Sequence, residues 1–205
     1  MASTTIVGSI SDNALRKYSP VSFSALLSGS AGVDDVTSGL VTIQRSYTGT
    51  NWTIRRPFFS FDVSALAGAT ITLAQLQLSC HDLLGDITWR VYYQDWGTDV
   101  ASDDWVAPID VPNLTPASAA GQEALGLGSL IVDLSNLGSL LTSNGRFVLI
   151  PPDEGVEPTA SHYQQFRTAD YPTPAYRPSL YVEYTTGVPV ISVAQVGAGI
   201  EVSWT

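Results

Sequence analysis

The chain has 205 residues, with 44% hydrophobic residues and 9 Lys and Arg residues against 19 Asp and Glu residues. The formal charge of -10 at pH 7 repels phosphate backbones and anionic lipid surfaces, so neither nucleic acids nor membranes are expected partners. The single cysteine, Cys80, allows no internal disulfide, and with two histidines it cannot complete a Cys/His zinc site. We expect no signal peptide, because the first residues lack a basic start followed by a continuous apolar run.

The composition favours an all-β protein with many turns. Seventeen glycines and twelve prolines accompany many Thr, Ser and Val residues, whereas few Lys or Glu residues are available for exposed helical faces. The length suits one buried core, so we expect one domain with appendages and no long amphipathic helix.

The first 46 residues are predicted to form an N-terminal arm and the first strands of a sandwich. Apolar runs at residues 4–10, 21–27 and 39–47 interrupt a stretch rich in Ser, Thr and Gly, which favours an opening strand, an irregular loop and a second strand. Residues 28–39 are the part that we least expect to be regular.

The clearest strand lies at residues 70–80, where Thr72 to Cys80 alternate between an apolar and a polar face. A second strand is predicted at residues 86–96, with Trp89, Val91 and Tyr93 on one face. A short turn separates the two segments, so we expect a hairpin between them.

The rest of the core is predicted to be a long connection at residues 97–129 followed by strands near residues 130–134, 145–150, 161–170 and 178–186. About eight strands separated by turns are typical of a two-sheet sandwich. The expected core spans residues 47–186.

Two similar segments suggest two related corners of the chain. FDVSALAG at residues 61–68 and VDLSNLGS at residues 132–139 share an Asp, a Ser and a Leu at the same spacing. In each, the Asp or Ser can accept from backbone N–H groups and the Leu of one helical turn can pack under the sheet. Repeated crossing between sheets favours an antiparallel jelly roll.

A C-terminal extension at residues 187–205 is predicted to form a β-hairpin. Two short strands, at residues 191–196 and 200–204, flank a Gly-Ala-Gly turn. An isolated hairpin is marginally stable in water, so we expect it to dock on the sandwich or on a neighbouring chain.

Several motifs together resemble the DNRLRE-type modules, a family of jelly-roll β-sandwiches that overlaps carbohydrate-binding modules. They are RPFFSFDVSALAGATITLAQLQL, ITWRVYYQDW, VDLSNL, GRFVLI and FRTADYPTPAYRPSLYVEY, and they cover roughly residues 47–184. The resemblance implies a non-catalytic accessory or structural module. A small lysine-poor β-sandwich with an exchangeable hairpin is also similar to head-decoration or fibre proteins of bacteriophage particles.

The sequence favours no catalytic site. His81 and His162 lie outside any Gly-x-Ser-x-Gly or other nucleophile motif, so a hydrolytic triad is disfavoured. The long connection carries clustered carboxylates that could form a glycosidase pair or a calcium site, although no EF-hand loop is present. A solvated acidic loop is the favoured interpretation, and a structural calcium ion stays an alternative. The carboxylates are Asp95, Asp99, Asp103, Asp104 and Asp110.

Aromatic residues in predicted loops or on polar strand faces are the best functional candidates. Flat rings can stack on sugar faces or fill a protein interface. The candidates for partner or glycan contact are Trp52, Trp96, Trp105, Tyr163, Tyr171 and Tyr176. For Trp96 and Trp105, anchoring of the loop is an equal alternative.

The arginines beside prolines are predicted to be structural. In an acidic chain with few cations, they suit ion pairs that tie strand ends together. The predicted structural residues are Arg55, Arg56 and Arg177, with Asp62, Asp133 or Glu183 as partners.

Taken together, these features predict a non-enzymatic structural protein on the surface of a virus particle. The arm, loops and hairpin would contact other copies or other virion proteins by strand addition and aromatic packing. The alternative is a carbohydrate-binding module whose exposed Trp and Tyr side chains stack on a glycan.

Overall fold

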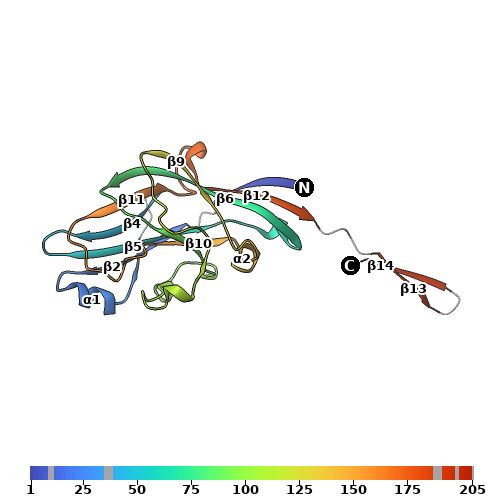
Figure 1. Cartoon of the computed structure of the whole chain (residues 1–205), viewed down its shortest axis with the longest axis horizontal. Helices are drawn as coiled ribbons and strands as arrows, with labels where there is room; N and C mark the ends of the chain where they lie inside the picture. Colours follow the sequence, from blue (N-terminus) through green and yellow to red (C-terminus); the bar gives the residue numbers. More distant parts are fainter. Residues whose placement is uncertain (9–11, 35–38, 187–190, 197–198, 205) are drawn as a thin grey trace.

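The computed structural model describes residues 1–8, 12–34, 39–186, 191–196 and 199–204, and it confirms the all-β prediction. Twelve strands form one curled antiparallel sheet, and two more form a separate two-stranded sheet (Figure 1). The strands are β1 (Ala2–Val7), β2 (Asn13–Ser19), β3 (Gly32–Asp34), β4 (Leu40–Tyr47), β5 (Trp52–Ser60), β6 (Ala69–Leu84), β7 (Arg90–Tyr93), β8 (Thr115–Pro116), β9 (Gly128–Asp133), β10 (Arg146–Ile150), β11 (His162–Arg167), β12 (Ser179–Thr186), β13 (Ile191–Val196) and β14 (Gly199–Trp204).

The helices of the described residues are short. They are α1 (Phe23–Ser28), α2 (Gly138–Thr142) and the 3-10 turns η1 (Ser64–Leu66), η2 (Ser102–Asp104), η3 (Val111–Asn113) and η4 (Pro174–Tyr176). The apolar run at residues 21–27, expected to be loop, forms α1, because Ser22 caps it by accepting from the Ala25 N–H at 3.0 Å. In the described part of the chain, no helix has the length and apolar character needed to cross a membrane.

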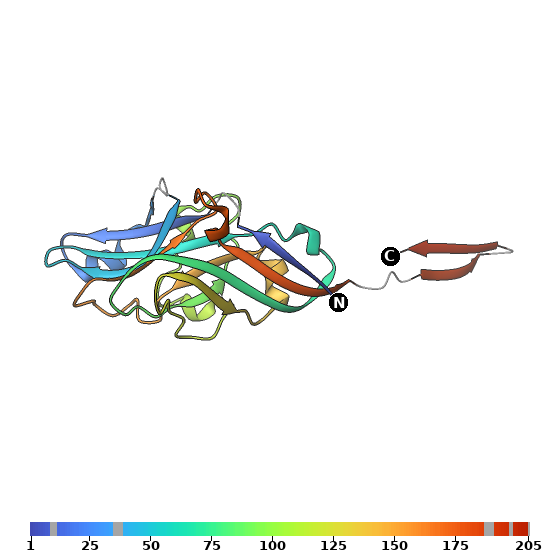
Figure 2. The ribbon, with the colours of Figure 1, turned by 90° about the horizontal axis from the view of Figure 1, so that it is seen from above.

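The sheet curls because two long strands change neighbours along one edge. β6 pairs with β12 through Ala69–Gln77 and then with β11 through Cys80–Leu84, while β9 occupies its opposite edge. β5 changes in the same way from β4 to β10, with β2 on its other edge. The two halves of the sheet therefore face each other (Figure 2). The jelly-roll assignment within this sandwich-like fold stays a prediction.

The predicted hairpin between residues 70–80 and 86–96 is wrong, although both strands exist. β6 pairs with β12, β11 and β9, whereas β7 pairs with β10 and β8. The residues between β6 and β7 therefore connect strands that are not neighbours. The estimate of about eight strands was also low, because short strands such as β3 and β8 carry little sequence signal.

The main core lies between the two halves of the curled sheet. It includes Phe59, Phe61 and Val63, together with alternate residues of β6. β5 is also covered on its other side, since Phe58 belongs to a second cluster with Trp96 and Val148. This double burial accounts for the consecutive buried residues from Arg56 to Ser60, where a strand with one exposed face would alternate.

The two similar corners fold as expected in their apolar part. Leu66 in η1 is buried, and Leu137, just before α2, packs against the same main core. The polar part differs: Asp62 Oδ1 accepts from the Ser64 N–H at 3.0 Å, whereas Asp133 Oδ1 accepts from Gln75 Nε2 at 2.8 Å.

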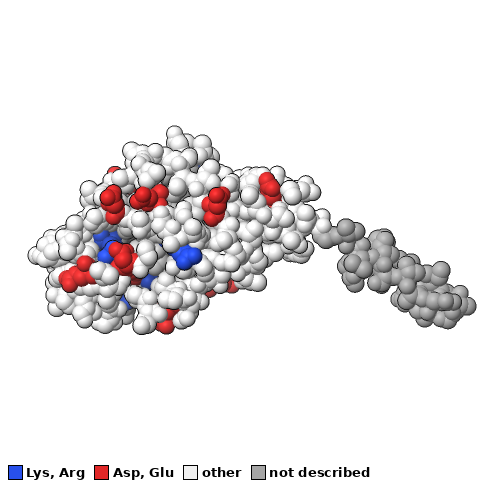
Figure 3. Space-filling model, in the orientation of Figure 1, with Lys and Arg blue, Asp and Glu red and all other residues white. Residues whose placement is uncertain are grey.

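The C-terminal strands β13 and β14 pair in an antiparallel register, which confirms the predicted hairpin. Ile191 lies opposite Trp204, and Val193 lies opposite Val202. The linker at residues 187–190 and turn residues 197–198 lie outside the described residues. The view of the molecule in Figure 3 shows scattered carboxylates and few basic groups, as the net charge of -10 requires.

Candidate functional site

The outward face of β11 carries a row of polar side chains that the chain does not need for its core. Tyr163, Gln165 and Arg167 alternate with the buried Gln164 and Phe166. The pairing of β11 with β4 runs without a bulge, so the three residues share one face of the strand. Their Cα atoms span roughly 13 Å, because a strand rises about 3.3 Å per residue.

A small polar cavity of about 160 Å³ opens on this face. Its lining comes from four adjacent strands and consists of Thr42, Gln44, Arg55, Asp82, Tyr163 and Gln165. The Tyr163 hydroxyl donates to Asp82 Oδ2 at 2.8 Å, and this bond raises the pKa of the phenol. Gln44 Oε1 is buried and has no hydrogen-bond partner among the described residues. The cavity therefore offers amide, hydroxyl and guanidinium groups on a rigid sheet.

Arg167 contacts two tyrosine rings at one end of the row. Its Cζ atom is 4.9 Å from the ring centroid of Tyr171 and 4.6 Å from that of Tyr176. The guanidinium also donates to Ser79 Oγ at 2.6 Å and to the Cys80 carbonyl at 3.2 Å. These bonds to β6 fix the guanidinium, and cation–π contacts with it hold both rings at the surface.

The two rings belong to a loop at residues 168–178, which we call the tyrosine loop. The Thr168 N–H donates to the Gly39 carbonyl at 2.9 Å, and Arg177 Nε donates to the Tyr171 carbonyl at 2.9 Å. Gly39 has a φ of 68°, and a Cβ atom there would lie 3.1 Å from Tyr171 Cα. A glycine is therefore needed for this close approach.

A buried carboxyl group anchors the start of the tyrosine loop. Asp12 Oδ2 accepts from the Ala169 N–H at 3.0 Å, and Asp12 Oδ1 accepts from the Ser60 N–H at 3.1 Å. Burial raises the pKa of Asp12 to about 8, despite the two N–H groups that favour its charged form. Asp12 thus joins the loop to the end of β5 through a group that titrates near neutral pH.

Half of the predicted aromatic candidates lie on this face. Tyr163, Tyr171 and Tyr176 come together around the β11 row, and Tyr176 is 45% exposed. Trp96 is only 5% exposed, because its ring packs edge-on against Phe58 in the second core cluster. That packing leaves its ring little surface for a ligand.

The other two tryptophans pack against the sandwich away from the β11 row. Trp52 stacks on Tyr47 and donates to Glu157 Oε1 at 2.9 Å. Trp105 lies with its ring centroid 4.0 Å from Arg56 Cζ and contacts two apolar clusters. These contacts of Trp105 anchor the long connection to the sandwich, which is the alternative role given above for this residue.

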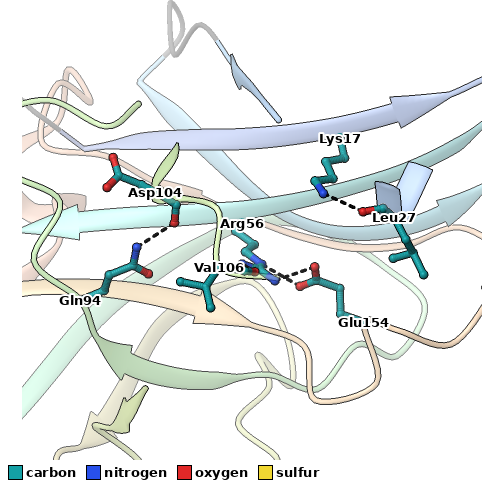
Figure 4. A network of polar contacts seen from close by, with 7 residues as sticks. All are labelled: Lys17, Leu27, Arg56, Gln94, Asp104, Val106 and Glu154. Carbon is teal, nitrogen blue, oxygen red and sulfur yellow. Dashed lines mark hydrogen bonds and ion pairs between the residues drawn. The ribbon is translucent and has the colours of Figure 1, made fainter. Parts of the chain in front are cut away.

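Arg56 is fully buried and pairs with a carboxylate that the sequence did not suggest (Figure 4). Its Nε and Nη2 atoms donate to the two Glu154 oxygens at 2.7 Å each, and Nη1 donates to the Val106 carbonyl at 2.7 Å. Lys17 Nζ lies nearby and donates to the Leu27 carbonyl at 3.0 Å. This bidentate pair ties β5 to the segment after β10 and to the long connection.

The remaining predicted structural residues have separate roles. Arg55 lines the polar cavity, Arg177 holds the tyrosine loop, and Asp62 and Asp133 accept the bonds described for the two corners. Arg56 pairs with Glu154 and not with the predicted partners Asp62, Asp133 or Glu183.

The acidic loop is held by hydrogen bonds and one ion pair. Asp95 pairs with Arg146 and accepts from Asn144 Nδ2 at 2.8 Å, and Asp104 Oδ2 accepts from the Ala101 N–H at 2.7 Å. Across the described residues, no three His, Cys, Asp or Glu side chains gather to hold a metal ion. A larger cleft of about 680 Å³ lies beside this loop, between η1 and α2.

The sequence analysis did not predict Arg167, Gln44 or Gln165 as residues of the candidate site. The available signal was the alternation of Tyr163, Gln165 and Arg167 within HYQQFR, which places three polar residues on one strand face. That signal gives no reason to join them to Gln44 or Tyr171, which come from other parts of the chain.

No family model matches the chain, and no curated protein matches it either. The resemblance to DNRLRE-type modules therefore stays a prediction based on the motifs quoted above.

Proposed function

We propose that the protein is a non-enzymatic binding module that holds a hydroxyl-rich glycan on the outward face of β4, β11 and β6. The observation that carries this proposal is the row from Tyr163 to Arg167, which ends at the ring of Tyr176. Aromatic faces pack on the apolar faces of sugar rings, and amide, hydroxyl and guanidinium groups pair with sugar hydroxyls.

The physical properties of the face support a neutral polar ligand. Its hydrogen-bonding groups stand on β-strands, so they lose little conformational freedom on binding. The side chains along the row are amides and phenols, and Arg167 already bonds to Ser79 and Cys80. The roughly 13 Å of the row suits a short oligosaccharide chain.

Glycan-array screening followed by calorimetry tests the proposal. We expect Tyr176→Ala to weaken glycan binding about tenfold, which corresponds to about 1.4 kcal/mol of lost ring contact. Tyr18→Ala is the matched control, because Tyr18 is 54% exposed on β2 and should not affect binding. Equal binding by the wild-type protein and Tyr176→Ala, or no bound glycan on the array, would overturn the proposal.

The second candidate is a structural role in an assembly, including the surface of a virus particle. It is favoured by the C-terminal hairpin, which forms its own two-stranded sheet. Co-purification of the chain with virus particles, without glycan binding, would favour this candidate over the first.

A further inference from the structure

The polar cavity on the β11 face contains a buried acceptor that the described residues leave without a donor. This atom is Oε1 of Gln44, a residue of β4 that lines the cavity. The other end of the same amide is engaged, because Gln44 Nε2 donates to Ser46 Oγ at 3.0 Å. Buried acceptors in proteins almost always have a donor, so Oε1 of Gln44 is a point where a ligand can add a hydrogen bond.

The strand register places Gln44 among the other polar groups of the cavity. Gln44 lies opposite Tyr163 of β11 and opposite Arg55 of β5. Two residues further along β11, Gln165 lies opposite Asp82 of β6. Opposed residues have Cβ atoms about 4.5–5.5 Å apart, so one small group seated here can reach Gln44 and its neighbours together.

The charges around the cavity favour a neutral group. The lining holds one cation, Arg55, and one anion, Asp82, so any charged group is repelled by one of them. Both oxygens of Asp82 already accept hydrogen bonds, from the Leu83 N–H at 2.9 Å and from the Tyr163 hydroxyl at 2.8 Å. A hydroxyl group suits this setting, because it can donate to Gln44 and accept from a neighbouring donor at the same time.

We propose that Gln44 determines the specificity of the glycan site by accepting a hydrogen bond from one hydroxyl group of a neutral sugar. This inference rests on the proposed glycan binding and adds the residue that selects among sugars. The ring of Tyr176 offers a contact that many sugar rings can use, whereas Gln44 requires a donor at one position of the sugar. A site with a buried acceptor rejects an analogue that lacks the donor, because the acceptor is then left unpaired.

The first test uses the wild-type protein and simple sugars. The probes are D-glucose, D-galactose and D-mannose, each with its monodeoxy derivatives, and D-glucosamine and D-glucuronic acid as charged counterparts. Dissociation constants come from NMR titration of the isotope-labelled full chain, with the side-chain amide signal of Gln44 as the local readout. We expect one neutral hexose to shift this signal, and loss of a single one of its hydroxyl groups to weaken binding at least about tenfold. The two charged sugars should bind more weakly than that hexose.

The second test substitutes Gln44. Gln44→Met removes the acceptor, so it should weaken binding of the hexose about tenfold and should bind the hexose and its deoxy derivative equally. Gln44→Glu keeps an acceptor oxygen and should still distinguish the two sugars. The matched control is Gln77→Met, since Gln77 lies on β6 outside the cavity and its Oε1 accepts from Ser179 Oγ at 3.2 Å. This control should bind as the wild-type protein does.

Several results would overturn the proposal. One is that every monodeoxy derivative binds as tightly as its parent sugar, and another is that Gln44→Met keeps the discrimination of the wild-type protein. A glycan that binds on the array while none of these hexoses shifts the Gln44 signal also contradicts it. Sugar binding that is lost in Tyr176→Ala but unchanged in Gln44→Met refutes this inference alone. No binding of any sugar, either in the titrations or on the array, refutes the proposed function as well.

Discussion

The buried pair of Arg56 and Glu154 allows a sharp test of how the sandwich is held together. Both side chains are almost fully buried, at 0% and 2% exposure, and two hydrogen bonds of 2.7 Å join them. We consider Glu154→Gln, which keeps the shape of the side chain and removes its charge.

The expected cost is about 3 kcal/mol of the free energy of unfolding. Removing one partner of a buried pair costs about 3–5 kcal/mol, because the other charge stays buried without compensation. The amide oxygen of Gln retains one of the two bonds, which places the cost at the lower end. Lys17 increases the cost of Glu154→Gln. Burial and the charge of Arg56 already lower the pKa of Lys17, and the Glu154 carboxylate opposes the repulsion between these two cations.

Urea denaturation followed by tryptophan fluorescence measures the effect. The matched control is Asp153→Asn, which removes the adjacent carboxylate. Asp153 is 53% exposed and pairs with Arg45, so its loss should cost less than about 1 kcal/mol. The double variant Arg56→Met with Glu154→Leu should be more stable than Glu154→Gln, because it leaves neither charge of the pair buried without its partner. Equal stabilities of the Glu154→Gln and Asp153→Asn variants would refute the reasoning.

Two further predictions concern single positions. The pKa of Asp12 is about 8 in the folded state, whereas in the unfolded chain it is near 3.8. Between these two values only the folded state holds the proton, so the free energy of unfolding of the wild-type protein should fall by up to about 1.4 kcal/mol per unit of rising pH. Asp12→Asn should lack this slope in melting temperatures measured from pH 5 to 9, and identical slopes would contradict the assignment. Gly145→Ala should unfold at much lower urea concentration than Gly49→Ala. Both glycines have positive φ, but only the Cβ atom at Gly145 would meet backbone, 2.3 Å from the Phe61 carbonyl oxygen. Equal midpoints would show that this contact relaxes freely.

The candidate site was only partly predictable, and the tryptophans show why. Trp96 and Tyr176 both lie in irregular segments with polar neighbours, so the sequence treats them alike. The fold buries Trp96 on Phe58 and leaves Tyr176 at the surface against Arg167. Burial of a loop residue depends on what packs over it, which local pattern does not encode.

The sequence by itself determined the all-β class and most strands of the sandwich, including β6, β10, β11, β12 and the C-terminal hairpin. These features follow from alternation and turn residues, which act between neighbours in the chain. Only the tertiary structure decided that β6 and β7 are not partners and that Arg56 meets a glutamate 98 residues away. It also decided that the tyrosines gather around β11, because such contacts depend on how a curled sheet brings distant segments together.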